Sequence, residues 1–184
     1  TTILDATKPW EEKKALLDWK KRVGKEKAQE ITTQSANIGT VVHNMLEYHI
    51  LGEEQKQKNN YIYQEAKKFA DIVIDQGLSN VDEVWGTEVP LYYPELYAGT
   101  TDCVGIWNGK PAIIDFKTTR KPKKREWIDG YFLQLTAYSL CHNQVYGTDI
   151  NTGVIMMICW DGPNAGQYQE FTLDEEGFEK YSKM

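Results

Sequence analysis

The spacing of hydrophobic and polar residues changes along the chain, from a helical period in the first third to a strand period after residue 81. Apolar residues three or four positions apart predict helices over 9–23, 25–31, 38–51 and 61–76. The polar stretch 32–37 separates the second helix from the third, and Ser35 or Asn37 is expected to cap the third. The polar stretch 53–60 predicts a loop between helices.

Strand patterns dominate the remainder of the chain. Residues 81–93 alternate between two faces, residues 152–160 form a nearly continuous apolar run typical of a buried strand, and residues 166–172 return as another strand. Helical spacing reappears over 127–145 and from residue 174 to the end. The sequence therefore predicts an α/β fold with a mixed central sheet of about five strands flanked by helices.

A length of 184 residues fits one domain with a sizeable core. We expect a helical N-terminal part over 9–76 and a sheet with its flanking helices over 81–184, in a single domain over 1–184. We find no repeat and no low-complexity tract.

Asn108-Gly109 is a strong signal for a two-residue hairpin turn, because both central residues of a type I′ turn have positive φ. This turn would pair Val104 with Ile113 and place Asp102 directly opposite Asp115. Cα atoms of such non-hydrogen-bonded pairs approach to roughly 4.5 Å. Because side chains alternate between the two faces of a strand, Lys117 shares the face of Asp115.

Two aspartates opposite each other repel, so this arrangement needs a compensating cation. Lys117 supplies one positive charge, and a divalent ion would supply more. Carboxylate ligands favour a hard ion, which makes Mg²⁺ or Mn²⁺ the expected cofactor. The alternative is an exposed end of a sheet with solvated charges.

The formal net charge is −6, which argues against a protein that coats nucleic acid through bulk positive charge. A local basic cluster nevertheless follows the predicted strand: Arg120, Lys121, Lys123, Lys124 and Arg125. Its position favours phosphate contacts, and Trp127 and Tyr131 could stack on bases. The other interpretation of the run is a solvated loop.

Three cysteines without CxxC spacing fit a reducing compartment and predict no disulfide framework. Three thiols cannot fill four ligand positions, so no iron–sulfur cluster is expected. No apolar run reaches membrane-spanning length. We expect a cytoplasmic protein of a bacterial or phage-infected cell, while a removed organellar targeting segment stays open because the chain starts without methionine.

The predicted helix over 38–51 contains His43 and Glu47, four positions apart on one face. Both side chains could approach a metal, although a helical histidine is more often a satisfied structural residue. Glu88, on the strand over 81–93, is a further candidate, and a surface carboxylate is at least as good an interpretation of it.

Four motifs together resemble the PD-(D/E)XK nuclease superfamily in its RecB-like exonuclease branch. They are Gly39 with His43, then Asp102, then Asp115-Phe116-Lys117, and finally Gln134 with Tyr138. The stretch around the histidine is similar to phage exonucleases and to mitochondrial genome maintenance exonucleases. The resemblance covers most of residues 16–140.

This resemblance implies a restriction-endonuclease-like core and a metal-dependent deoxyribonuclease. The implied catalytic residues are Asp102, Asp115, Lys117, Gln134 and Tyr138. The implied metal ligands are His43, Asp102, Asp115 and the backbone carbonyl of Phe116, with Glu88 and Glu47 as additional candidates. The expected DNA contacts are Ser35, Thr40, the basic cluster, Trp127 and Tyr131.

The resemblance also implies an exonuclease that acts on single-stranded DNA ends in recombination, repair or replication, with the early helices as an arch over the strand. Its protein partners are not identified by the sequence. Two alternatives remain: an endonuclease of the same fold, of junction-resolvase or restriction type, and a non-catalytic module that binds DNA ends. The residues alone leave open the polarity of digestion and the choice between DNA and RNA.

Overall fold

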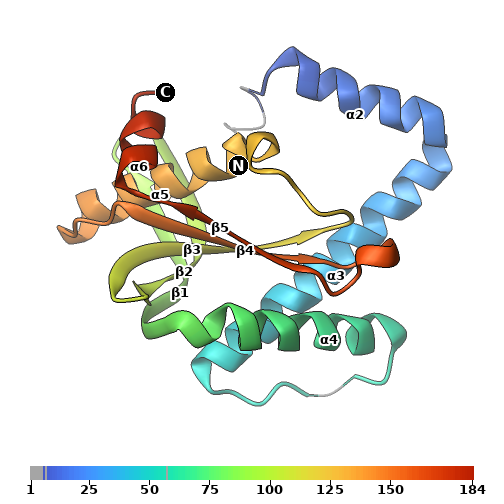
Figure 1. Cartoon of the computed structure of the whole chain (residues 1–184), viewed down its shortest axis with the longest axis horizontal. Coiled ribbons are helices and arrows are strands. Elements are labelled where there is room, and N and C mark those ends of the chain that lie inside the picture. Colours follow the sequence, from blue (N-terminus) through green and yellow to red (C-terminus); the bar gives the residue numbers. More distant parts are fainter. Residues whose placement is uncertain (1–5, 7, 57) are drawn as a thin grey trace.

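The computed structural model describes residues 6, 8–56 and 58–184, and confirms the predicted α/β fold with a five-stranded mixed sheet (Figure 1). Its helices are α2 (Trp10–Val23), α3 (Lys25–Leu51), α4 (Tyr61–Gln76), α5 (Asp129–Tyr146) and α6 (Glu175–Ser182). Its strands are β1 (Val81–Tyr93), β2 (Tyr97–Trp107), β3 (Lys110–Thr119), β4 (Thr152–Cys159) and β5 (Tyr168–Leu173). Short 3₁₀ turns cover Leu78–Asn80, Arg125–Trp127 and Gly162–Asn164.

The strands lie in the order β1-β2-β3-β4-β5. All neighbours are antiparallel except β3 and β4, which are parallel and are joined through α5. Two parallel strands need such a crossover, because the chain must return to the end of the sheet where the first strand began before the second strand can start. The crossover places α5 directly after the strand that carries Asp115 and Lys117.

Helices cover both faces of the sheet, so the central strands are buried on both sides. On β3, Ala112, Ile114 and Phe116 pack into a core with α3 and α4. Ile113 packs into the opposite core, which contains Phe132 of α5. The predicted alternation of β3 is therefore confirmed, and every residue of β4 is buried as its continuous apolar run predicts.

The Asn108-Gly109 turn is also confirmed. Both residues have positive φ, 45° and 75°, as a type I′ turn requires. The register places Trp107 opposite Lys110, and Val104 opposite Ile113. Two local signals, a turn dipeptide and an alternating pattern, were enough to align these strands.

The prediction of two helices separated at 32–37 was wrong, because α3 runs without a break from Lys25 to Leu51. Ser35 is no N-cap: its hydroxyl donates to the carbonyl of Ile31 at 2.8 Å within the helix. Such back-bonding to the preceding turn satisfies polar side chains that usually favour caps. The burial of Ile38, Val42 and Leu46 against the sheet provides the packing that stabilises the helix.

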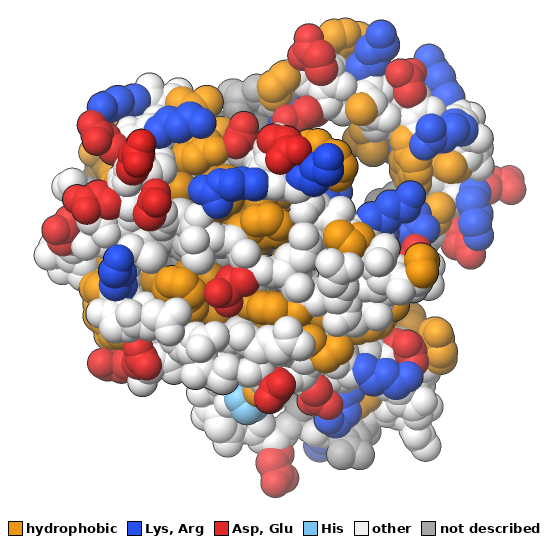
Figure 2. All heavy atoms as spheres, in the orientation of Figure 1, with side chains coloured by type: hydrophobic (Ala, Val, Ile, Leu, Met, Phe, Trp, Pro, Cys, Tyr) orange, Lys and Arg blue, Asp and Glu red, His pale blue; other side chains and the backbone are white. Residues whose placement is uncertain are grey.

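Helix α2 stands away from the sheet and connects to the rest of the molecule through α3 (Figure 1). None of its residues is buried, and Trp10, Leu16 and Leu17 are exposed. Lysine and arginine side chains recur along this arm, at the upper right of Figure 2. Among the described helices, none is both long and apolar enough to cross a membrane.

Candidate active site

Strands β2 and β3 separate where the candidate carboxylates lie. Their ladder ends at Cys103 opposite Ile114, whereas β3 continues to pair with β4 as far as Thr119. Strand β2 continues to pair with β1 as far as Tyr97. We call this point of separation, with Asp102 on one side and Asp115 on the other, the fork.

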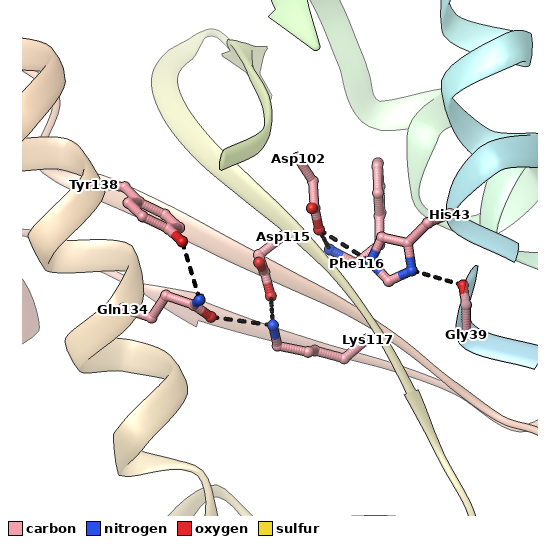
Figure 3. Close-up of polar contacts among 8 residues, drawn as sticks. All are labelled: Gly39, His43, Asp102, Asp115, Phe116, Lys117, Gln134 and Tyr138. Carbon is pink, nitrogen blue, oxygen red and sulfur yellow. Dashed lines mark hydrogen bonds and ion pairs between the residues drawn. The ribbon is translucent and has the colours of Figure 1, made fainter. Parts of the chain in front are cut away.

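The fork corrects one detail of the expected register. Asp102 and Asp115 are not a paired couple of the ladder, which stops one position earlier. Instead, Asp102 Oδ2 accepts a hydrogen bond from the backbone N–H of Phe116 at 2.7 Å (Figure 3). The Asp102 carboxylate thus accepts the hydrogen bond that a strand partner would otherwise accept, although the charge of Asp102 still acts on Asp115.

His43 reaches the fork from α3 and is held by two contacts (Figure 3). Its Nε2 lies 3.2 Å from Asp102 Oδ2, and its Nδ1 lies 2.9 Å from the carbonyl oxygen of Gly39, one helical turn earlier. A carbonyl only accepts, so Nδ1 carries a hydrogen and Nε2 faces the carboxylate. This is the orientation that a second contact imposes on metal-binding histidines.

The glycine four positions before the histidine has its own structural reason. A Cβ on Gly39 would lie 3.2 Å from Thr118 Oγ1, closer than ordinary contacts. The absence of a side chain lets α3 approach β3 and brings His43 within reach of Asp102. The Gly39–His43 spacing thus combines a close helix–strand approach with an oriented imidazole.

Asp115 and Lys117 form a buried ion pair on the other side of β3. The side chains of Asp115 and Lys117 are 5% and 22% exposed, and Lys117 Nζ lies 2.6 Å from Asp115 Oδ2. Besides this ammonium, Asp115 Oδ2 has no hydrogen-bond donor among the described residues. A buried carboxylate is costly unless a cation pairs with it, and Lys117 is the cation that does so here.

Three residues of α5 complete the group of side chains around the Lys117 ammonium. Lys117 Nζ donates to Gln134 Oε1 at 3.1 Å, and Gln134 Nε2 donates to the hydroxyl of Tyr138 at 3.2 Å (Figure 3). The ring of Tyr131 lies below the ammonium, 5.0 Å from Nζ to the ring centre. Gln134 and Tyr138 are both buried.

The His43–Asp102 pair is charged around neutral pH. Burial opposes charge on the imidazole, but the hydrogen bond and the charge of Asp102 outweigh it and raise the pKa of His43 to about 9. Burial likewise favours neutral Asp102, but the contacts with His43 and the Phe116 N–H lower the pKa of Asp102. In the absence of any other cation, the histidine neutralises this carboxylate.

In the Asp115–Lys117 pair the pKa of the acid is shifted upward, opposite to the shift of Asp102. Burial raises the pKa of Asp115 to about 6; Lys117 opposes the rise and Asp102 adds to it. Burial opposes charge on Lys117, yet Asp115 and Asp102 outweigh it and raise the pKa of the ammonium. Burial therefore outweighs the ion pair with Lys117 in its effect on the pKa of Asp115.

The chemistry of these side chains fits a divalent metal. Asp102 and Asp115 offer carboxylate oxygens at the fork, and His43 is oriented by Gly39. No three His, Cys, Asp or Glu side chains within the described ranges are arranged closely enough to hold an ion as they stand. The reason is visible in the contacts, since the two carboxylates are turned toward His43 and Lys117.

Glu47 and Glu88 lie at the edge of this site. Burial raises the pKa of Glu88, and the charges of Asp102 and Glu47 add to the rise, so the carboxylates are near one another. Glu88 is exposed and has a φ of 46°, which is strained for a residue with a side chain. It falls between the paired residues Thr87 and Val89 of β1.

We expect Glu88→Gly to stabilise the protein. Relief of the left-handed strain outweighs the added entropy of glycine in the unfolded chain, for a net gain of about 0.5 to 1 kcal/mol. Urea denaturation measures the change. Glu95, with a φ of 63° in the turn between β1 and β2, is the matched control, and Glu95→Gly should behave alike. A loss of stability in Glu88→Gly alone would show that the Glu88 side chain makes a stabilising interaction.

The basic cluster after β3 divides into two groups. Arg120 forms an ion pair with Asp161, and Arg125 donates to the carbonyl of Thr172 while its guanidinium lies over the Phe132 ring. Both arginines therefore hold the loop against the body. Among described residues, the ammonium groups of Lys121 and Lys123 contact no partner, and Lys124 lies over the exposed ring of Trp127.

The two remaining candidates lie on α3, away from the fork contacts. The Ser35 hydroxyl is occupied within the helix. Thr40 lines a separate cavity of about 530 Å³ between α3 and the segment before α4. Sequence reasoning missed Gly99, where a Cβ would lie 2.7 Å from Tyr138 Cε1.

The fold and the site define an α/β protein whose sheet opens around two aspartates, a lysine and a histidine. The same fold occurs in a solved structure of a candidate exonuclease from Eubacterium rectale, with a TM-score of 0.54 and 12% identity over 80% of this chain and 63% of that one. At this identity the likeness concerns the fold alone. No protein-family model matches the chain.

Curated relatives are found by sequence. The chain is 29% identical to mitochondrial genome maintenance exonuclease 1 of Xenopus tropicalis, over 90% of this chain and 49% of the relative. It is 30% identical to the protein of the same name from Mus musculus, over 98% of this chain and 54% of the relative. The chain thus spans about half the length of the curated relatives it matches.

Proposed function

We propose that this chain hydrolyses phosphodiester bonds of DNA as a metal-dependent exonuclease, using Mg²⁺ or Mn²⁺. The observation that carries the proposal is the clustering of two carboxylates and a histidine at the fork: the buried Asp115, paired with Lys117, lies close to the Asp102–His43 pair. The relatives named as exonucleases support the same activity. The overall pattern agrees with the PD-(D/E)XK superfamily and its RecB-like branch.

In this proposal His43, Asp102, Asp115 and the carbonyl of Phe116 hold the metal, with Glu47 and Glu88 available at the edge. A bound divalent ion lowers the pKa of water and stabilises charge on the phosphate oxygens. The raised pKa of Lys117 keeps its ammonium protonated, so Lys117 positions the phosphate and the attacking water and stabilises the developing negative charge. Gln134 and Tyr131 fix the position of the ammonium.

The substrate in this proposal is single-stranded DNA with a free end. Helix α2 and the basic loop after β3 lie on the same side of the molecule (Figure 1), and both carry lysines and arginines. A strand that passes between them would reach the fork through an arch formed by α2 and α3. The exposed Trp127 offers a face on which a base can stack.

Mitochondria are the proposed location, with maintenance of DNA as the process. The names of both relatives refer to mitochondria, and their sources are a frog and a mouse. These findings give no support to the bacterial or phage cytoplasm expected from the sequence. They agree with the other expectation, an organellar protein.

The test is incubation of the protein with end-labelled single-stranded, duplex and circular DNA, with Mg²⁺, Mn²⁺ or EDTA. We expect metal-dependent shortening of the single strand from one end, and no product in EDTA. Equal cutting of circular and linear DNA would instead indicate an endonuclease of the same fold. Retention of DNA without any cleavage would indicate a module that only binds ends.

The free lysines of the basic loop should contribute to DNA affinity more than its arginines. We expect Lys121→Ala with Lys123→Ala to weaken binding of a labelled single strand and to reduce the slope of log affinity against log salt by about 1.4, roughly 0.7 for each phosphate that is no longer neutralised. Fluorescence anisotropy at several salt concentrations measures both. The matched control removes two lysines of α4 that pair with neighbouring acids, Lys67 and Lys68. An equal loss of affinity in that control would assign the effect to net charge.

A further inference from the structure

A cavity of about 760 Å³ adjoins the candidate active site on the α5 side. Its walls are the first residues of β2, one face of α5 and the end of α6, and we call it the α5–β2 pocket. Its volume lies in the range typical of small-ligand sites. Two side chains of α5, Gln134 and Tyr138, line the pocket and connect it to Lys117 through hydrogen bonds.

Gln134 and Tyr138 belong to both places. They line the α5–β2 pocket, and Gln134 also accepts the hydrogen bond from Lys117 and donates to Tyr138. The Tyr138 ring lies against the backbone of Gly99, in the opposite wall. A group in the pocket would thus lie one side chain away from the ammonium that the proposed function places at the scissile phosphate.

The lining of the α5–β2 pocket selects against charged groups. Among the described residues that form its walls there is no Lys, Arg, Asp or Glu, and apolar surface from Leu133, Ala137 and Leu140 predominates. Thr100 and Gln134 add neutral hydroxyl and amide groups, which can both donate and accept hydrogen bonds. A flat, uncharged group with polar edges fits this combination, and a nucleobase is such a group.

The surrounding aromatic rings suit the same ligand. Tyr97 lines the pocket and stacks on Tyr93, with ring centres 5.8 Å apart, while its hydroxyl donates to the carbonyl of Ala137. A tyrosine fixed in this way offers a preorganised wall. Stacking on aromatic side chains is the usual way in which proteins hold unpaired bases without regard to sequence.

We propose that the α5–β2 pocket binds the nucleobase of the nucleotide next to the scissile phosphate, after that base has left its stack. The inference rests on the proposed nuclease function, since the phosphate position at Lys117 comes from it. A base held there anchors the strand while its phosphate lies at the fork. Duplex DNA, whose bases are paired, cannot occupy the pocket without unpairing, which gives a structural basis for a single-strand preference.

The experiment moves one abasic residue along a single-stranded oligonucleotide and measures single-turnover cleavage at each bond. We expect cleavage to slow about tenfold when the abasic residue adjoins the scissile phosphate, the loss of one stacked base, and to change little at distant positions. Ala137→Phe fills the pocket and should slow cleavage of the normal substrate. In this variant the normal and the abasic strands should be cleaved at similar rates. Ala165→Phe, the same change at an exposed site outside the pocket, should behave as wild type.

Ser182→Trp narrows the same pocket from the exposed end of α6 and should give the same result even where Ala137→Phe does not fold. Equal cleavage of normal and abasic strands at every position would overturn the proposal. The pocket would then be a site for a protein segment and not for a base. Binding of trithymidylate and its abasic counterpart to Asp115→Asn, measured by anisotropy, tests the pocket without cleavage. A preference for the trinucleotide with bases, lost in the Ala137→Phe background, would support the pocket even if the nuclease function failed.

Discussion

Lys117→Ala should reduce DNA cleavage by about a thousandfold or more while the fold persists. The ammonium is the cation nearest to Asp115, and Gln134 and Tyr131 hold it in place. The two arginines of the following loop cannot replace it, because they are engaged with Asp161 and with Thr172. Initial rates on a labelled single strand in Mg²⁺ measure the loss.

Folding of this variant is checked by circular dichroism and by its denaturation midpoint. Lys110→Ala is the matched control, because Lys110 is an exposed residue of the same strand. We expect it to cleave at the wild-type rate. Wild-type cleavage by Lys117→Ala would remove Lys117 from the mechanism and with it the assignment of the fork as the active site.

Asp115→Asn should reduce DNA cleavage about as strongly as Lys117→Ala does. The same substitution should stabilise the metal-free protein at neutral pH. Burial raises the pKa of Asp115 to about 6, so the folded protein binds this proton more tightly than the unfolded chain does. Its contribution to stability therefore falls as the pH rises from about 4 through 6. The asparagine does not ionise, and we expect a gain of about 1 to 3 kcal/mol at pH 7.5 that vanishes near pH 4.

Urea denaturation in EDTA at the two pH values measures this effect, with Asp75→Asn on the exposed side of α4 as control. In a second measurement, Mn²⁺ should raise the melting temperature of the wild type and of the control but not that of Asp115→Asn. Undiminished stabilisation by Mn²⁺ would exclude Asp115 as a ligand. Equal stability of the two proteins at pH 7.5 would show that the buried carboxylate is compensated without metal.

Local signals predicted the sheet well. Asn108-Gly109 determined the register of β2 and β3, and the alternating pattern of β3 determined which residues lie on each face. Both depend on neighbours in sequence. The number of apolar segments also predicted a mixed sheet of about five strands, whereas the order of the strands came from the structure.

Predictions failed where distant packing decides. The polar residues over 32–37 resemble a helix start, but contact of α3 with the sheet makes the helix continuous. The ladder continues in the sequence pattern past Cys103, but Asp102 turns its carboxylate to the Phe116 N–H instead. The engagement of Arg120 with Asp161, 41 positions away, is likewise beyond any local pattern.

The site residues differ in how far along the chain their contacts reach. Lys117 and Gln134 are 17 positions apart, and Asp102 and Phe116 are 14 apart, so most of the site lies within one hairpin and the helix after it. His43 and Asp102 are 59 apart. Closing that longer loop carries a larger entropic cost, so the site consists of a local unit and one side chain brought from afar. The contacts among Asp115, Lys117 and Gln134 therefore form without α3, whereas His43, the metal ligand of the proposed function, reaches the fork only through the packing of that helix against the sheet.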